Sequence, residues 1–231
     1  MSRRGARATG KEGARGTGDG NGRRERRRRG SKRTAGGEAA DRTSRTAWVY
    51  RLIRNTVLWL LPVGALWAAA TPAYNHFLRV AGQNLIHVTE SPDVTRLHRH
   101  DPHTVLIGRI DFPPNDEIVS SFRLTDLHFP VILLGALFLA VPSVSRRRRL
   151  ENLGVALVIS AVFHVVLVLL WVKFTYATQL GSWSLEHYGS FSRNAWGLAK
   201  HVADLPVKLG LPFLLWAAFY LDRLLPASPE S

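Results

Sequence analysis

SVSRRRRLENLG, residues 143–154, places four consecutive arginines between two long runs of apolar residues. Short loops that carry several lysines or arginines lie on the cytoplasmic side of membrane proteins. Each basic side chain close to anionic headgroups gains about 1 kcal/mol, so the arginines would hold such a loop at the inner surface. The stretch therefore indicates a tight cytoplasmic turn, predicted over residues 146–152, between two membrane crossings.

Four segments are apolar enough to be crossings, because about 20 helical residues span the roughly 30 Å hydrocarbon core. Residues 55–73 contain no charged side chain, and residues 153–172 are almost entirely apolar. Residues 127–142 are a shorter run, and residues 205–221 carry Lys208 near their start, from where its long side chain can reach the headgroups. The sequence therefore predicts an all-α membrane protein with four transmembrane helices, at residues 47–73, 127–145, 153–176 and 205–222.

Basic residues beside the predicted helices fall on one face of the membrane. They are Arg51, Arg54, Arg146, Arg147, Arg148 and Arg149. The opposite face is not enriched: residues 79–126 hold 5 Lys and Arg against 7 Asp and Glu, and residues 177–204 hold 2 against 2. This asymmetry predicts that both termini, including the tail at residues 223–231, are cytoplasmic.

Two other interpretations of the apolar segments stay open. A soluble helical bundle needs charged faces at helical period, whereas these segments are apolar on all sides. Residues 55–73 end in AAATPA, which has the small residues of a signal-peptide cleavage site. The basic stretch before this run is long for a signal peptide, so an uncleaved anchor is favoured.

The N-terminal tail is basic and low in complexity. Residues 1–54 carry 17 Lys and Arg against 5 Asp and Glu, and large apolar side chains are almost absent before Trp48. Such a composition cannot bury enough surface to offset the entropy of ordering, so residues 1–46 are predicted to be disordered. Arginine-rich tails bind the phosphates of lipids or nucleic acids. Anionic membrane lipid is favoured over nucleic acid, because the tail has no aromatic residue for base stacking.

Residues 74–126 form the largest predicted extracytoplasmic loop. Within it, residues 94–100, 103–112 and 117–125 alternate apolar and polar side chains and are separated by turn residues. This pattern predicts a small antiparallel sheet of three strands. A sheet of this size is not stable alone, so we expect it to pack on the membrane surface or on a partner.

Two amphipathic stretches are expected to lie as short helices along the outer membrane surface. In the first, Phe77, Val80, Ala81 and Leu85 recur at helical spacing. The second lies within residues 177–204, an extracytoplasmic segment rich in the aromatic residues that favour membrane interfaces. Both are predicted to be separate from the crossings.

Three histidines surround the predicted hairpin turn: His98, His100 and His103. In paired strands His98 and His100 share a face and His103 lies across from His100, so the imidazoles could bind zinc or copper. A two-residue turn at Asp101 is disfavoured before Pro102, which predicts a wider loop that separates the rings. A metal site, a pH-responsive patch and a solvated loop all stay open.

His164 lies near the middle of the third predicted crossing, with Ser160 one turn earlier. An ionisable side chain at this depth marks a candidate functional site. One interpretation is a neutral histidine packed against a neighbouring helix, and the other is a proton path. A proton path needs further acids or bases within the crossings, and we identify only Lys208, which argues against a transporter.

The chain contains no cysteine, which excludes disulfide bonds, thiolate metal sites and a cysteine nucleophile. Phosphate-binding loops, dinucleotide glycine motifs and HExxH zinc motifs are absent from the sequence as well. We therefore expect a protein without catalytic activity and without a cofactor.

The order of these segments resembles that of a known family. The stretches RNTVLWLLPVGALWAAATPAYN, EIVSSFRLTDLHFPVILLGALFLAVP and LGLPFLLWAAF, with the strand-rich loop and the basic turn, are similar to small integral membrane proteins associated with exosortases. The resemblance implies a non-catalytic accessory or scaffold subunit of a bacterial inner-membrane complex, with a membrane-protein partner and a link to exosortase-type protein sorting. It carries over no functional residue. The alternatives are a sensor that binds metal through the three histidines, and a small transporter.

Overall fold

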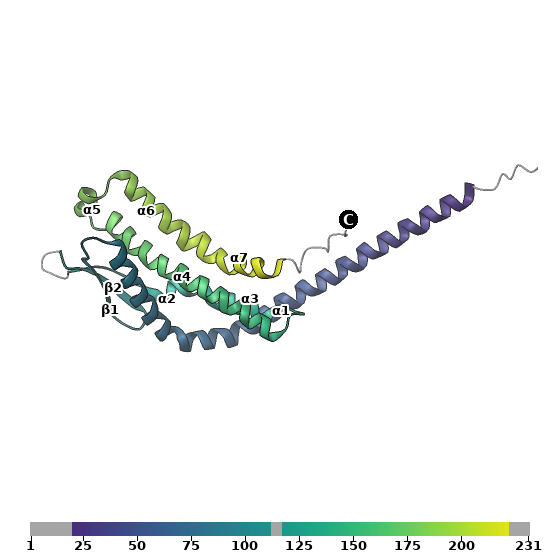
Figure 1. The fold of residues 1–231 in the computed structure, drawn as a ribbon, viewed down its shortest axis with the longest axis horizontal. Coiled ribbons are helices and arrows are strands. Elements are labelled where there is room, and N and C mark those ends of the chain that lie inside the picture. Colours follow the sequence, from purple (N-terminus) through teal and green to yellow (C-terminus); the bar gives the residue numbers. More distant parts are fainter. Residues whose placement is uncertain (1–19, 112–116, 222–231) are drawn as a thin grey trace, which may run out of the picture. The chain divides into compact units, whose positions relative to one another are not determined.

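The computed structural model describes residues 20–111 and 117–221, with side chains from residue 46 onward except at residue 117. Its elements in chain order are α1 (Gly20–Thr89), β1 (Thr95–Arg99), β2 (Thr104–Arg109), β3 (Glu117–Arg123), α2 (Leu124–His128), α3 (Val131–Ala140), α4 (Arg146–Thr178), α5 (Ser182–His187), α6 (Ser190–Val202), the π-helix η1 (Ala203–Val207) and α7 (Lys208–Tyr220) (Figure 1). The described chain is thus mostly helical. It divides into two units, Met1–Ala47 and Trp48–Ser231, and the second holds the sheet.

The first unit contains the start of α1, from Gly20 onward. Here the structure differs from the disorder expected for residues 1–46, because residues 20–46 are helical. Arginine, lysine, glutamate and alanine are strong helix formers and are frequent in this stretch, so local propensity favours a helix here. Residues 1–19 lie outside the described part of the chain, as do residues 222–231.

Three helices are long and apolar enough to cross a membrane: Thr46–Thr89, Arg146–Thr178 and Ser190–Tyr220. The predicted second crossing, residues 127–145, is not a helix of this length. It consists of α2 and α3, which together give an apolar helical stretch, Leu124–Ala140, of about 25 Å. Pro130 separates the two short helices because it lacks the backbone N–H that a continuous helix needs. Three helices could therefore cross a membrane, and the prediction of four crossings is not confirmed.

The two predicted surface helices are parts of longer ones. The stretch at residues 77–85 belongs to α1, which continues past Pro72 to Thr89 and does not end at residue 73 as predicted. Within residues 177–204, α5 is short, and α6 passes through η1 into α7. The wider turn of η1 contains Pro206, which cannot donate a helical hydrogen bond, so the helix continues past the proline with a local change of pitch.

The predicted three-stranded antiparallel sheet is confirmed, in the order β1-β2-β3. Thr95 pairs with Arg109 across β1 and β2, and a β-bulge interrupts the pairing of β2 with β3 at Gly108. The free edge of β1 is covered by a side chain of α1. Gln83 Nε2 donates to Thr95 O at 3.0 Å, and Leu97 N donates to Gln83 Oε1 at 2.7 Å. The amide thus takes the place of a neighbouring strand on an edge that would otherwise be open to pairing.

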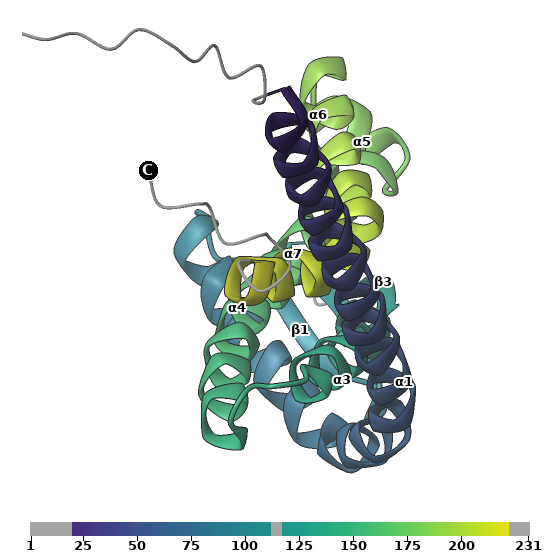
Figure 2. The same cartoon turned by 90° about the vertical axis from the view of Figure 1, so that its right-hand side faces the viewer.

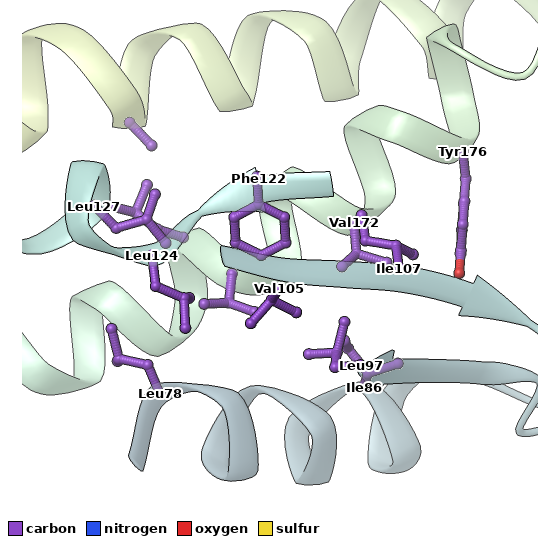
Figure 3. Close-up of a cluster of buried hydrophobic side chains, with 13 residues drawn as sticks. Leu78, Ile86, Leu97, Val105, Ile107, Phe122, Leu124, Leu127, Val172 and Tyr176 are labelled. Carbon is purple, nitrogen blue, oxygen red and sulfur yellow. The ribbon is translucent and has the colours of Figure 1, made fainter. Parts of the chain in front are cut away.

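The sheet packs on the chain's own helices, and this protein core replaces the membrane surface or partner that the sequence led us to expect. Leu78 and Ile86 of α1 point toward the strands, and Ile86 lies beside Leu97 of β1 (Figure 3). Val172 of α4 closes the cluster. We call this half of the second unit the sheet end, defined by the buried core Leu78, Ile86, Leu97, Val105, Ile107, Phe122, Leu124, Leu127, Leu167, Val168, Val172, Tyr176 and Ala203.

A second core joins α3, α4 and α7, which run side by side (Figures 1 and 2). We call this half the arginine end, because it includes Arg146–Arg149. These residues are the first helical turn of α4 and not part of a separate loop of the kind predicted over residues 146–152. Its buried members are Leu134, Leu137, Phe138, Val141, Val144, Ala156, Trp216 and Tyr220, with Trp48 and Leu52 of α1 packed against them. Gly135 of α3 lets that helix approach α1 closely, since an added Cβ would lie 2.8 Å from Val63.

Candidate functional site

The three histidines around the hairpin turn are not assembled as metal ligands. His98 pairs with Leu106 in the sheet, while His103 contacts Thr125 Oγ1 through Nδ1 at 3.1 Å. In the part of the chain that the structure describes, no group of three or more His, Asp or Glu side chains is placed to hold a metal ion. The metal prediction for His98, His100 and His103 therefore finds no support in the geometry.

The loop between β1 and β2 is wider than two residues, as the proline argument predicts. It runs from His100 to His103 and is organised by the Asp101 side chain. The backbone N–H groups of His103 and Thr104 donate to Asp101 Oδ1 at 2.6 and 2.7 Å. These hydrogen bonds lower the pKa of the Asp101 carboxyl group, because they stabilise its charged form.

His164 is buried in α4 and bonded to another helix. Its Nδ1 lies 2.9 Å from Tyr74 Oη of α1, and its side chain is 2% exposed. Ser160, one turn earlier, is buried as well. This is the arrangement that the packing interpretation describes, with a partner on the neighbouring helix.

A second buried imidazole, His128 of α2, is absent from the sequence argument. It is fully buried, with Trp67 Nε1 donating to its Nδ1 at 3.1 Å and Asn75 Oδ1 lying 2.7 Å from its Nε2. The indole N–H can only donate, so Nδ1 accepts and the proton of neutral His128 is on Nε2, which donates to Asn75. Asn75 Nδ2 in turn donates to Pro102 O at 2.7 Å. Each of the three hydrogen bonds thus has one donor and one acceptor, and together they connect α1, α2 and the hairpin loop.

The two imidazoles are neighbours. Their ring centroids are 6.5 Å apart, and the Tyr74 ring lies edge-on to both, at 5.1 Å from His128 and 6.1 Å from His164. His128 lies inside the segment predicted as the second crossing. The search for further acids or bases within the crossings, which identified only Lys208, therefore overlooked this histidine. The sequence signal for this site was His128 itself, an ionisable residue in a mainly apolar segment two residues before Pro130.

A chain of charged side chains runs along α6, η1 and α7. Asp204 accepts from Lys208 and lies 3.3 Å from Lys200 Nζ. Lys200 Nζ also lies 4.0 Å from the Trp171 ring centroid, a cation–π contact. Both lysine side chains are largely buried, at 10% and 13% exposure.

The ammonium group of Lys208 is also bound to the backbone of a neighbouring element. Its Nζ donates to Asp126 O at 3.1 Å. That carbonyl would bond the N–H four residues later in a helix, but this residue is Pro130, which has none. Lys208 therefore supplies the donor that the proline removes.

One of the two imidazoles, His164, and one of the two lysines, Lys208, line the same cavity. Ser160, His164 and Lys208 line this space between α4, α7 and the start of α3, and its volume of about 10 Å³ is close to that needed by one water molecule. Buried polar and ionisable groups around a cavity form the arrangement in which water or a proton can be exchanged between side chains. Among the described residues this is the place where the chain's interior chemistry concentrates.

A further charged site fastens the sheet to α4 and α5. The Arg109 guanidinium lies 4.7 Å from the Tyr176 ring centroid and 4.6 Å from that of Trp183. It bonds Asp111 through Nε at 2.8 Å and Nη2 at 2.6 Å, while Nη1 is 3.9 Å from Glu90 Oε1. The hydrogen bonds from Arg109 lower the pKa of Asp111. The contacts surround the guanidinium, so its role is structural.

Together these features define a class: a helical protein with three helices able to span a membrane, a small sheet packed on them, and a buried polar interior. No family model, curated protein or solved structure matches the chain. The resemblance to exosortase-associated proteins therefore stays a prediction.

Proposed function

We propose that the protein is a multi-pass protein of the bacterial inner membrane that serves as a non-catalytic accessory or scaffold subunit of a membrane complex. The observation that carries this proposal is how little apolar helix surface the chain covers by itself. In the most apolar window of each long helix, 11%, 28% and 11% of the residues are buried. Leu61 and Leu66 of α1 are 81% and 72% exposed. Lipid and a protein partner are the natural cover for such a surface.

The interior supports a structural role. The hydrogen-bonding groups of Trp67, His128 and Asn75 are occupied by one another, and Lys208 is occupied by Asp204 and a backbone carbonyl. Buried polar groups that satisfy one another hold a single packing arrangement. A sensor with metal at the hairpin histidines is not proposed, because their side chains do not converge.

The proposed topology has both termini in the cytoplasm. Asn55 Nδ2 donates to Ala140 O at 3.3 Å, and Asn152 Nδ2 donates to Tyr220 Oη at 3.1 Å. The start of the first apolar segment, the turn before α4 and the end of α7 therefore share one end of the unit, as the positive-inside rule requires of their basic flanks. Because two cytoplasmic termini require an even number of crossings, this topology includes a fourth crossing through α2 and α3, which needs the residues after Ala140 or a locally thinner bilayer.

The partner can be tested by site-specific photo-crosslinking in native membranes, with the crosslinking residue at Leu61 or at Leu66. We expect crosslinks to a second membrane protein, and the resemblance favours a component of exosortase-type protein sorting. Crosslinks to lipid alone, or to a second copy of this chain, would contradict an accessory subunit. Leu78, which is fully buried, is the matched control position on the same helix and should give no intermolecular product.

A second candidate function, a small proton-linked transporter, is favoured by the cavity that His164 and Lys208 share. Its test is proton flux in liposomes containing the purified protein. A transporter loses flux in the His164→Ala variant, while a scaffold shows no flux above empty liposomes.

A further inference from the structure

The arginine end contains a groove that the proposed scaffold role does not use. Trp59 of α1, Leu139 of α3 and Leu150 of α4 line it, with Arg146 and Arg149. Its volume of about 280 Å³ is close to the lower end of the roughly 300–1,000 Å³ of small-molecule sites, and its exposed lining is mainly apolar. An apolar groove that ends at two guanidinium groups matches a ligand with a hydrocarbon chain and an anionic head.

Arg149 is held in place at this groove. Its Nη1 donates to Leu139 O at 2.7 Å and its Nε donates to Val144 O at 2.9 Å. The first of these carbonyls belongs to the last turn of α3, where helical acceptors lack partners. The guanidinium is therefore fixed beside the groove by the backbone that forms the groove's wall.

The charge around the groove is not balanced by the described residues. Four arginines occupy the first turn of α4, which contains no acidic residue, although a helix N-terminus already carries partial positive charge. Glu151 pairs with Arg147 at 2.7 Å and offsets one of the four. Arg146 is exposed at the first residue of the helix and lines the groove. An anion bound at this point relieves the repulsion among these cations.

We propose that the groove binds one anionic phospholipid, with an acyl chain between Trp59, Leu139 and Leu150 and its phosphate at Arg146 and Arg149. The inference rests on the proposed membrane location, because such a lipid is available only there. It goes beyond a general attraction of basic residues to anionic membranes, since it assigns the lipid to one groove. Basic pockets between helices at the cytoplasmic surface have the charge and depth for anionic headgroups.

The test is lipid binding by the purified full-length protein in a neutral detergent, followed by native mass spectrometry. The probes are phosphatidylglycerol and phosphatidylcholine with identical acyl chains. We expect phosphatidylglycerol to bind at least fivefold more tightly, and Arg146→Gln to weaken its binding about fivefold, the equivalent of about 1 kcal/mol. Arg148→Gln is the matched control, because it removes the same charge from the same turn but does not line the groove. Equal losses in the two variants would overturn the groove as the site.

A second variant tests the apolar part. Leu139→Trp fills the groove and should abolish preferential binding, whereas Val155→Trp, at an exposed position on α4 that does not line the groove, should leave it unchanged. Brominated acyl chains quench the fluorescence of a tryptophan that they contact. The quenching of tryptophan fluorescence by brominated phosphatidylglycerol should therefore be larger in the wild type than in Trp59→Phe. Equal binding of the two lipids, an unaffected Leu139→Trp variant, or displacement of lipid by a partner protein's helix would each contradict the proposal.

Carbonate extraction of membranes separates this inference from the proposed function. If the protein resists extraction but shows no lipid preference, the lipid site is wrong and the membrane location stands. If carbonate releases the protein, both proposals fail.

Discussion

The sheet end and the arginine end of the second unit are held together in different ways. At the sheet end, hydrogen bonds and ion pairs connect distant segments, as in the Gln83 contacts to β1 and the guanidinium of Arg109 between two rings. At the arginine end, large apolar side chains pack around α3, Gly135 allows close helix approach, and Asn55 and Asn152 each add one hydrogen bond between distant helices. Hydrogen bonds are directional, so they fix the position of the strands relative to the helices at the sheet end. At the arginine end, the apolar side chains pack closely but leave a groove that is open to a ligand.

Removal of His128 should have the largest effect, and it tests whether polar contacts dominate the sheet end. His128→Ala leaves Trp67 Nε1 and Asn75 Oδ1 without their buried partner and opens a cavity. Unsatisfied buried groups cost about 1–3 kcal/mol each, so we expect a loss of about 3–5 kcal/mol in the free energy of unfolding. Thermal unfolding in detergent, followed by tryptophan fluorescence, measures the change. His100→Ala, in the exposed hairpin loop, is the control and should have almost no effect.

A result near zero for His128→Ala would mean that water replaces the imidazole without cost. The sheet end would then be held mainly by its apolar core, like the arginine end, and the contrast between the two ends would disappear.

Arg109→Met is expected to have the second largest effect. It removes a guanidinium that is 9% exposed from between two aromatic rings and leaves Asp111 without its bidentate partner. We expect a loss of about 2–3 kcal/mol, since the methionine retains part of the packing but not the charge. The matched control is Arg96→Met on β1, whose ion pair with Asp93 is more exposed and is expected to contribute less than about 1 kcal/mol. Similar losses in both variants would show that burial of Arg109 adds nothing.

Gly135→Ala tests the arginine end, with a smaller expected effect. The added Cβ would lie 2.8 Å from Val63 Cγ1, and the β-branched valine has few other rotamers. We expect a loss of about 1–2 kcal/mol from overpacking. Gly154→Ala in α4 meets no atom within 4 Å and should stabilise the helix by about 0.5–1 kcal/mol. If both alanines stabilise the protein, α1 and α3 are not in close contact.

Local patterns in the sequence account for much of the fold. Alternating side chains between turn residues predict all three strands, and the apolar run at residues 153–172 predicts α4. The continuation of α1 past Pro72 was missed, because a proline reads as a helix end when packing contacts are unknown. Likewise, the hydropathy of residues 127–145 predicts a full crossing, whereas Pro130 divides the segment into α2 and α3.

The candidate site was less predictable than the fold. His164 is recognisable from sequence, because an ionisable residue stands out in an apolar helix. The His128 network joins α1, α2 and the hairpin loop, and its contacts span up to 61 residues of sequence. No local spacing encodes such a network, since it depends on how distant elements pack. The same holds for Lys208, whose hydrogen bond to Asp126 O crosses 82 residues.

The smallest expected effect is a dependence of stability on pH that arises at the sheet end through Asp111. Hydrogen bonds from Arg109 lower the pKa of the Asp111 carboxyl group in the folded protein, so the unfolded chain binds a proton at higher pH than the folded chain does. The stabilisation from Asp111 is therefore complete above its unfolded pKa of about 3.9 and is lost as the pH falls through the folded value. Unfolding midpoints measured from pH 6 to pH 3 should fall more steeply in the wild type than in Asp111→Asn. Because this carboxylate is 43% exposed, water screens the pair and the difference should be modest. Parallel slopes would mean that Arg109 is held by its aromatic neighbours and by Glu90, and that Asp111 adds no stability of its own.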